Sequence, residues 1–458
     1  MRTIAAISTP AGKGGIAVIR VSGDDALTVA GRVFSCANGK SVGELPARFA
    51  AYGTIHTPGG DVLDTGICTP YRGPASFTGE DMAEISCHGG TFVTASVLAA
   101  VLAAGAEMAQ AGEFTKRSFL AGKLSLTEAE AVGRLIDADT EERMKLSSGA
   151  VRGVVSEKIR AIREPLFDVM TALYAAIDYP EEDVGDEGEE QIAAVVEQVL
   201  DGVRGLLATY KTGRAVADGV KTVICGRPNA GKSSLFNRLS GEDAAIVTKI
   251  AGTTRDILRQ TVSFGGVTLR LSDTAGLRET EDVVEQMGVT RAETEIRGAD
   301  LVLAVFDLTE GIGGEERDMM KAYPDCPRIA VLNKADTGAA FQEGDLEVIR
   351  ACHDVTVPVS CETGEGMDAL AAEVAKLWGS DRLEVGRDAV IWDVRQHAAL
   401  SRAEMYLAEA AAALACGDEI DAVCTVCESA LAALDETDGR MVNGEIVDAI
   451  FQRFCVGK

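Results

Sequence analysis

The chain has 458 residues and a mass of 48.0 kDa, which is long enough for about two to four domains with real cores. Hydrophobic residues make up 47% and charged residues 25%, and no apolar stretch is long enough to span a bilayer, which argues against a membrane protein. The formal net charge of −27 argues against nucleic-acid binding by overall electrostatics, but not against a local basic site or a partner that supplies one.

Residues 1–117 alternate short β-type runs, such as "GIAVIRVS" and "MAEISCH", with the helical runs "DDALTVAGRVF" and "TFVTASVLAAVLAAG". This pattern predicts a compact α+β domain. Lys13 and Arg20 interrupt the apolar start too early for a signal peptide, so we expect a cytoplasmic location. The eleven scattered cysteines fit a reducing compartment, where most are small buried apolar residues.

Two segments, 118–217 and 381–458, are rich in Ala, Leu, Glu and Arg and are predicted to be helical. The run 178–190 carries eight acids and no base, which is typical of a solvated loop. The isolated pair Cys424 and Cys427 lies in a helical pattern without further ligands, so we interpret it as two neighbours on one helix face.

Residues 218–380 alternate β-runs with helical runs, which predicts a mostly parallel sheet with crossover helices. The predicted fold class is therefore multidomain α/β: an α+β N-terminal domain, and a helical domain into which a Ras-like GTPase domain is inserted. The predicted domains are 1–117, 118–217 (first helical half), 218–380 (GTPase) and 381–458 (second helical half).

The segment "VICGRPNAGKSS" matches G-x-x-x-x-G-K-[ST], follows a β-run and opens a helical run, which is the context of a phosphate-binding loop. Its glycines let backbone N–H groups face phosphates, Lys232 is expected to reach the β- and γ-phosphates, and Ser233 to hold Mg²⁺. In "SDTAG", Asp273 is expected near Mg²⁺, and Gly276 is expected to sense the γ-phosphate.

Two later motifs predict guanine specificity. In "VLNKAD", Asp336 can accept two hydrogen bonds from the guanine N–H edge, Asn333 supports the loop and the Lys334 stem packs on the base. "PVSCETGEG" places Ser360 and Cys361 near the base. The chain is therefore predicted to be a GTPase.

Thr254 is the preferred switch residue for completing the Mg²⁺ shell, with Thr253 as its rival. Leu277 stands where Ras-type enzymes carry the glutamine that orients the attacking water. Arg255 and Arg278 are candidate arginine fingers by proximity alone. A slow switch that merely binds GTP is therefore an alternative at this point.

The segments "TPAGKGGIAVIRVSG", "SFTGED…ISCHGG", "GEFTKRSFLAGKLSLTEAEAVGRLIDA", "GRPNAGKSSLFNRLSGEDAAIV", "IAGTTRD", "DTAGLRET" and "FCVGK" together resemble the MnmE (TrmE) family of tRNA-modification GTPases over essentially the whole chain. The resemblance implies GTP hydrolysis activated by a K⁺ ion between dimerised GTPase domains. It assigns K⁺ to Asn229, Thr248, Ile250 and Thr253, and it assigns catalysis to Glu285.

With the motifs above, the resemblance implies the following GTP contacts: Asn229, Ala230, Gly231, Lys232, Ser233, Ser234, Thr248, Lys249, Ile250, Ala251, Gly252, Thr253, Thr254, Asp273, Thr274, Ala275, Gly276, Asn333, Lys334, Ala335, Asp336, Ser360, Cys361 and Glu362.

The resemblance also implies a second site, which holds a one-carbon donor. The family binds 5-formyl-tetrahydrofolate, or another tetrahydrofolate one-carbon derivative, and the matching positions are Arg20, Glu80, Lys123 and Lys458. Charges of both signs suit a pterin edge and an anionic glutamate tail. Cys455 in "FCVGK" is assigned to the modification centre, with its role as nucleophile, acid or redox-sensitive bystander left open.

As partners, the resemblance implies a homodimer formed by the N-terminal domain, the FAD-containing protein MnmG in a heterotetramer or larger complex, and tRNA, with no membrane. The two proteins together install a carboxymethylaminomethyl or aminomethyl group at C5 of the wobble uridine. The competing hypotheses are a GTP switch for ribosome or complex assembly, and a one-carbon enzyme that acts alone. Departures from the family pattern are small: Val456 replaces a usual Ile, and Cys361 a usual Ala.

Overall fold

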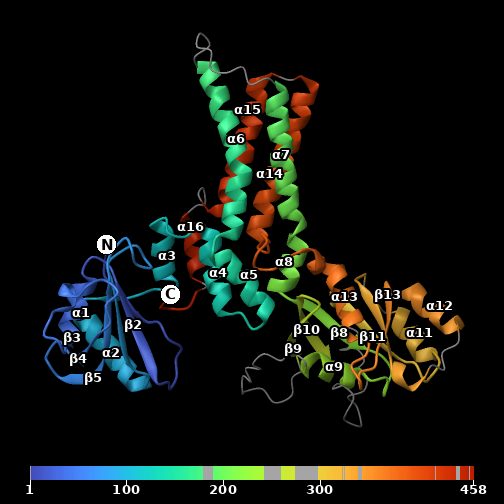
Figure 1. Cartoon of the computed structure of the whole chain (residues 1–458), viewed down its shortest axis with the longest axis horizontal. Helices are drawn as coiled ribbons and strands as arrows, with labels where there is room; N and C mark the ends of the chain where they lie inside the picture. Colours follow the sequence, from blue (N-terminus) through green and yellow to red (C-terminus); the bar gives the residue numbers. More distant parts are fainter. Residues whose placement is uncertain are drawn as a thin grey trace. The chain divides into compact units, whose positions relative to one another are not determined.

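The computed structural model describes residues 2–178, 189–241, 259–273, 298–321, 323, 325–338, 343–417, 419–439, 444–452 and 454–457. These residues form two compact units, Met1–Gly133 with Asp438–Lys458, and Arg134–Thr437 (Figure 1). Within the described ranges, no helix combines the length and the apolar character needed to cross a membrane.

The first unit is built on a mixed sheet in the order β3-β4-β5-β6-β2-β1-β7, antiparallel except for the β1–β7 pair. Its strands are β1 (Ile4–Ile7), β2 (Ile16–Ser22), β3 (Phe34–Cys36), β4 (Ala51–His56), β5 (Val62–Tyr71), β6 (Met82–His88) and β7 (Glu107–Met108). Helices α1 (Ala26–Val33) and α2 (Thr91–Ala103) pack on this sheet and close a core of small and β-branched residues.

Three further helices of the first unit share a small aromatic core. They are α3 (Glu113–Leu120), α4 (Leu126–Ile136), whose last residues pass into the second unit, and α16 (Gly444–Phe451). Leu126, Val447 and Phe451 are buried together there, with Phe119 and Phe454 packed against them. The C-terminal segment therefore docks onto the unit that contains the N-terminal sheet.

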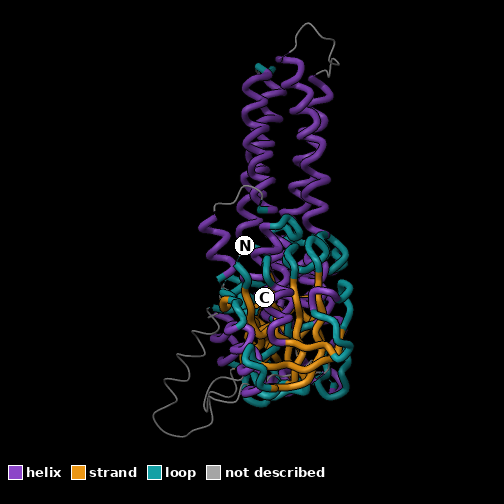
Figure 2. The backbone as a smooth tube through the Cα atoms, turned by 90° about the vertical axis from the view of Figure 1, so that its left-hand side faces the viewer, coloured by secondary structure: helices purple, strands orange, loops and turns teal. Residues whose placement is uncertain are grey.

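The second unit contains a bundle of long helices that lie side by side (Figures 1 and 2). The bundle helices are α6 (Val154–Asp178), α7 (Glu189–Ala208), α14 (Val394–Cys416) and α15 (Ile420–Asp438), and the shorter α5 (Glu141–Val151) and α8 (Tyr210–Ala217) lie at its base. Cys424 and Cys427 are buried in this bundle core, and burial raises the pKa of the Cys427 thiol to about 11. Both therefore behave as apolar core residues.

The same unit contains a second sheet in the order β13-β12-β11-β8-β10-β9, parallel except for the β9–β10 pair. Its strands are β8 (Val220–Cys225), β9 (Arg259–Phe264), β10 (Val267–Asp273), β11 (Leu301–Asp307), β12 (Arg328–Asn333) and β13 (Val355–Pro358). The helices of this part are α9 (Lys232–Gly241), α11 (Gly314–Lys321), α12 (Glu343–Cys352) and α13 (Met367–Trp378).

The predicted fold class is confirmed, and the β-runs of the GTPase region form the five parallel strands in the predicted places. The sequence analysis missed β3, β4, β7 and β9. Three of these strands lie at the edge of a sheet and β4 lies next to an edge, and all four have weak hydrophobic patterns. The predicted domain boundary at residue 117 falls within α3. Helix α16, which belongs to the predicted second helical half, packs in the first unit. The four domain ranges stay a prediction. The acidic run is described only at its two ends, and residues 179–188 lie outside the described part.

Candidate functional site

The phosphate-binding loop connects β8 to α9, at the carboxyl edge of the parallel strands. Gly226 (φ +150°), Asn229 (φ +65°) and Gly231 (φ +99°) bring the loop back on itself. Two of these positions are glycine, which takes up positive φ without strain, and Asn229 is one of the few other residue types that tolerate it. The Lys232 ammonium donates to the Arg227 carbonyl oxygen at 2.7 Å, so the charged group folds back onto the backbone of this loop.

Asn333 joins the phosphate-binding loop to the guanine loop. Its Nδ2 donates to the Ala230 carbonyl oxygen at 2.9 Å, and its Oδ1 accepts from the Cys361 N–H at 3.1 Å. A Cβ at Gly231 would lie 1.9 Å from Nδ2, so only glycine leaves room for this bridge. One buried amide therefore holds three predicted GTP-binding segments together.

Lys334 follows in a left-handed conformation (φ +64°), and its ammonium pairs with the Asp307 carboxylate at the end of β11. Burial alone would raise the pKa of Asp307, but hydrogen bonds from Lys334 and Thr309 outweigh it and hold that pKa below its ordinary value. Asp336 is exposed in the turn that follows, and Ser360 is buried beside it in the next loop. Burial raises the pKa of the Cys361 thiol to about 11, so Cys361 is a neutral group at this place.

The other predicted GTP and K⁺ residues are only partly described. Asp273 ends β10 and pairs with Ile224 of β8, the strand that leads into the phosphate-binding loop, and its role near Mg²⁺ stays a prediction. Residues 248–254 and 274–276, together with Glu285, lie outside the described residues.

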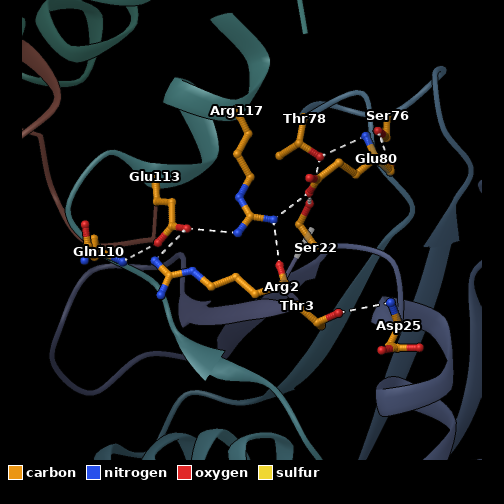
Figure 3. A network of polar contacts seen from close by, with 10 residues as sticks. All are labelled: Arg2, Thr3, Ser22, Asp25, Ser76, Thr78, Glu80, Gln110, Glu113 and Arg117. Atoms are coloured by element: carbon orange, nitrogen blue, oxygen red, sulfur yellow. Dashed lines mark hydrogen bonds and ion pairs between the residues drawn. The ribbon is translucent and has the colours of Figure 1, made fainter. Parts of the chain in front are cut away.

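A polar network in the first unit surrounds Glu80, a predicted cofactor-binding residue (Figure 3). Glu80 Oε2 accepts from Ser22 Oγ at 2.8 Å and from Arg117 Nη1 at 2.8 Å. Its other oxygen, Oε1, is buried and has no hydrogen-bond partner among the described atoms. A carboxylate that is held at one oxygen and unsatisfied at the other has acceptor capacity left for a ligand.

Arg20 and Lys123 lie around the loop that carries Glu80. The Arg20 guanidinium bonds Glu84 Oε1 at 2.7 Å and lies 5.3 Å from the centroid of the Phe77 ring. Lys123 Nζ donates to the Pro74 carbonyl oxygen at 2.8 Å. The structure therefore gathers three of the four predicted cofactor residues at one loop, 74–80, while Lys458 lies outside the described part.

Cys455 is exposed, but its backbone is fixed in the first unit. Its carbonyl oxygen accepts from the Gly112 N–H at 3.3 Å, and the next residue, Val456, forms an isolated antiparallel bridge with Ala111. The Gly457 carbonyl oxygen accepts from Ser8 Oγ at 2.9 Å. The tail is thus held as a short extended segment along two N-terminal loops.

Sequence reasoning missed the residues that position these groups. Arg117, whose side chain is 8% exposed, binds Glu80 and also Glu113, four residues earlier on α3; the i,i+4 spacing in "GEFTKRS" could have indicated the Glu113 pair, but nothing local indicates Glu80. Arg227 of the phosphate-binding loop pairs with Glu310 at 3.0 Å and with the buried Glu316 at 3.2 Å. The Arg117–Glu80 pair and the two Arg227 pairs join residues far apart in the chain, so no local pattern reveals them.

Family comparisons cover both units of the chain. A model described as the TrmE N-terminus matches residues 3–123, and a model described as the MnmE helical domain matches residues 126–455. The chain belongs to the MnmE family. The "tRNA modification GTPase MnmE" of Symbiobacterium thermophilum is 43% identical over 457 residues, covering 100% of this chain and 99% of the relative.

MnmE relatives from other bacteria match over similar lengths. The protein of that name from Moorella thermoacetica is 40% identical and covers 100% of this chain and 99% of its own length. Among solved structures, an Aquifex aeolicus Era variant bound to GDP and aluminium fluoride is 27% identical over 41% of this chain and 66% of its own, with a TM-score of 0.28. Both of these MnmE relatives match the chain from end to end.

Proposed function

We propose that this chain is a K⁺-activated GTPase that, with MnmG, adds a carboxymethylaminomethyl or aminomethyl group at C5 of the wobble uridine of certain tRNAs. The one-carbon unit comes from a tetrahydrofolate derivative. One observation supports this most directly: Asn333 bonds both the phosphate-binding loop and the guanine loop, in a chain matched along its whole length by tRNA modification GTPases. GTP hydrolysis in tRNA modification is the function of this chain.

The described residues fit GTP with Mg²⁺. The helix N-terminus at α9 and the turned backbone of residues 226–233 form a cradle of N–H groups for phosphates. Lys232 would neutralise phosphate charge, Ser233 would be a Mg²⁺ ligand together with Thr254, and Asp273 is expected near the ion. Asp336 reads the guanine edge from its exposed turn.

K⁺ is proposed to replace the missing arginine finger. A cation at that place supplies positive charge against the charge that develops on the phosphates. Asn229 has a positive φ, a backbone conformation that is rare for residues other than glycine and is found most often at functional sites. This conformation is consistent with a role as a K⁺ ligand. The proposed K⁺ ligand set is completed by Thr248, Ile250 and Thr253. Glu285 is proposed to position the attacking water indirectly, because Leu277 stands where Ras-type enzymes carry the glutamine for this task.

The cofactor proposal rests on the environment of Glu80. Its buried, unsatisfied Oε1 suits a donor edge such as that of a pterin ring. Arg20, Lys123 and Lys458 supply positive charge for a carboxylate tail. When bound, 5-formyl-tetrahydrofolate would supply the one-carbon unit, and the chain's own residues would bind and orient it. Cys455 is held by the docked tail beside Ala111 and Gly112.

The proposed assembly is a cytoplasmic homodimer that joins MnmG, a FAD-containing partner, and acts on tRNA. Two measurements test the proposal. Nucleosides of tRNA from a strain lacking this chain are expected to lose the wobble-uridine modification, and GTP turnover of the purified protein is expected to rise strongly in KCl relative to NaCl.

Each measurement has an outcome that rejects a separate part of the proposal. An unchanged nucleoside profile would favour a GTP switch for ribosome or complex assembly. Equal turnover in the two salts would remove K⁺ but leave GTP hydrolysis in place. A third measurement, incubation of tRNA with the purified chain without MnmG, addresses the remaining alternative: modified uridine there would indicate a one-carbon enzyme that acts alone.

A further inference from the structure

A cavity of about 320 Å³ lies in the first unit, between α3 and α16, and none of the predicted site residues lines it. Its volume is at the low end of the range of small-molecule sites, which begins at about 300 Å³. The residues that line it include Arg2, Gln110, Lys116, Leu120 and Gln452. The cavity therefore combines charge, two primary amides and an apolar wall.

The charge of the cavity differs in sign from that of the chain. Arg2, Lys116 and Arg117 line it against only two acids, Glu113 and Asp448, in a chain whose net charge is −27. Arg117 lies deepest, with 8% of its side chain exposed, and Figure 3 shows its guanidinium between Glu113 and Glu80. The other two cations are held by partly exposed pairs: Arg2 pairs with Glu107 at 3.0 Å and with Glu113 at 3.4 Å, and Lys116 pairs with Asp448. Such pairs exchange partners at little cost.

The cavity borders both parts of the proposed modification centre. Ala111 is one of its lining residues and pairs with Val456, directly beside Cys455. Arg117 reaches the Glu80 carboxylate on its other side at 2.8 Å, so one guanidinium separates the cavity from the proposed cofactor site. A ligand in this cavity would therefore lie next to the tail and next to the residues that orient the cofactor.

We propose that this cavity receives a single unpaired nucleotide of the RNA substrate, the wobble uridine, in a step that rests on the function proposed above. Single-stranded RNA loops are recognised by bases that turn out of the stack and meet polar side chains and apolar surfaces. The amides of Gln110 and Gln452 offer both a donor and an acceptor to the edge of a pyrimidine. The exposed Leu120 side chain offers an apolar surface to its face.

Arg2 and Lys116 carry the charge part of this recognition. Both side chains are partly exposed, and they would meet the phosphates that flank the base once their contacts to Glu107, Glu113 and Asp448 exchange. The positive charge would also attract an acidic protein or peptide. Such a partner would not use the amides of Gln110 and Gln452 or the apolar surface of Leu120. A nucleotide uses all three features, and this is why we assign the cavity to it.

The test uses the full-length protein with MnmG and an anticodon stem-loop RNA that carries 4-thiouridine at the wobble position. After irradiation, cross-linked peptides are mapped by mass spectrometry. Cross-links are expected within residues 110–120 or 444–452, and unmodified stem-loop is expected to compete for them. Lys116→Glu is expected to lower the yield about tenfold, as for the loss of one charged contact.

A matched control variant is Lys145→Glu. Lys145 is also a helical lysine paired with an acid, Glu141, but it belongs to the second unit and does not line the cavity. Its cross-linking yield and its GTP turnover are expected to equal those of the unchanged protein. GTP turnover of Lys116→Glu is also expected to be unchanged, because this lysine is not part of the GTPase region.

Cross-links found only elsewhere in the chain or on MnmG would overturn the assignment, and so would equal yields from the two variants. Displacement of the cross-link by 5-formyl-tetrahydrofolate alone would assign the cavity to the cofactor instead and also overturn it. The wobble nucleoside is measured in the same samples. Modification without a cross-link in the cavity rejects the cavity and keeps the function, whereas absence of modification in the unchanged protein counts against the function itself.

Discussion

At the scale of single residues, a few buried polar groups determine how the GTPase loops are arranged. Asn333 is 3% exposed and uses both ends of its amide, one toward Ala230 and one toward Cys361. A group of this kind has no water to replace a lost partner, so its removal leaves unsatisfied backbone atoms on both loops. Its contribution to GTP binding therefore exceeds that of an exposed side chain in the same loops.

Replacement Asn333→Ala is expected to weaken GTP binding by about 10- to 100-fold, since each unmade buried hydrogen bond costs about 1–3 kcal/mol. Titration with a fluorescent GTP analogue measures the affinity. Asn38→Ala, which changes an exposed asparagine of the other unit, is the control and is expected to leave affinity unchanged. Equal affinities for the two variants would mean that Asn333 does not organise the nucleotide site.

His353 predicts a pH dependence of stability in the second unit. Burial lowers the pKa of this imidazole below its ordinary 6.5, although the Ile349 carbonyl that accepts from it opposes the shift. The unfolded chain then binds the proton more readily than the folded one, so the free energy of unfolding falls as pH drops below about 6.5. Aromatic rings of Phe306 and Tyr323 pack against the neutral ring.

Urea unfolding followed by tryptophan fluorescence measures this effect, because both tryptophans, Trp378 and Trp392, lie in the second unit. Between pH 7.5 and 5.5, we expect His353→Gln to lose less stability than the unchanged chain. Identical pH dependence in the two proteins would show that His353 does not titrate in this way.

At the scale of elements, the docking of the C-terminal segment on α3 and α4 depends on close backbone approach. Gly112 has φ +64°, and a Cβ added there would lie 2.5 Å from the Phe451 carbonyl oxygen. Its N–H also donates to the Cys455 carbonyl oxygen. The glycine therefore serves the tail in two ways, by conformation and by space.

Gly112→Ala is expected to loosen the tail, so that carboxypeptidase releases its terminal residues at least about fivefold faster, as for a docking loss near 1 kcal/mol. Wobble modification should fall while GTP turnover is retained. Gly122→Ala is a matched control: Gly122 has φ +68°, the same unfavourable conformation, but nothing lies within 4 Å of an added Cβ. If both variants were digested at one rate, the clash with Phe451 would be irrelevant to docking.

At the scale of the whole molecule, the sequence was sufficient for features with local signals and insufficient for those made by long-range contacts. The phosphate-binding loop and the five parallel strands have strong local patterns and were predicted in place. The Arg117–Glu80 and Arg227–Glu316 pairs and the docking of Val456 on Ala111 join positions far apart in sequence, so only the folded chain reveals them. The cavity beside α16 was unpredictable for the same reason.

The charge of the molecule leads to a last prediction about tRNA. A net charge of −27 disfavours the binding of phosphates overall, and the cavity offers Arg2 and Lys116. For a single-stranded loop, the slope of log affinity against log salt is about −0.7 for each phosphate neutralised, so two contacts give about −1.4. We therefore expect weak, salt-tolerant binding by this chain alone, and tighter, steeper binding once MnmG is added.

Fluorescence anisotropy with a labelled anticodon stem-loop, across a series of KCl concentrations, measures the slope. Lys116→Gln is expected to reduce its magnitude by about 0.7, the share of one phosphate contact, and Lys145→Gln is expected to leave it unchanged. A slope of about −4 or steeper for this chain alone would require an extended basic surface, as in proteins that make 6–10 phosphate contacts. Such a surface would contradict the view that MnmG supplies most of the positive charge, because an acidic chain with one cationic cavity neutralises only the phosphates next to the base it holds.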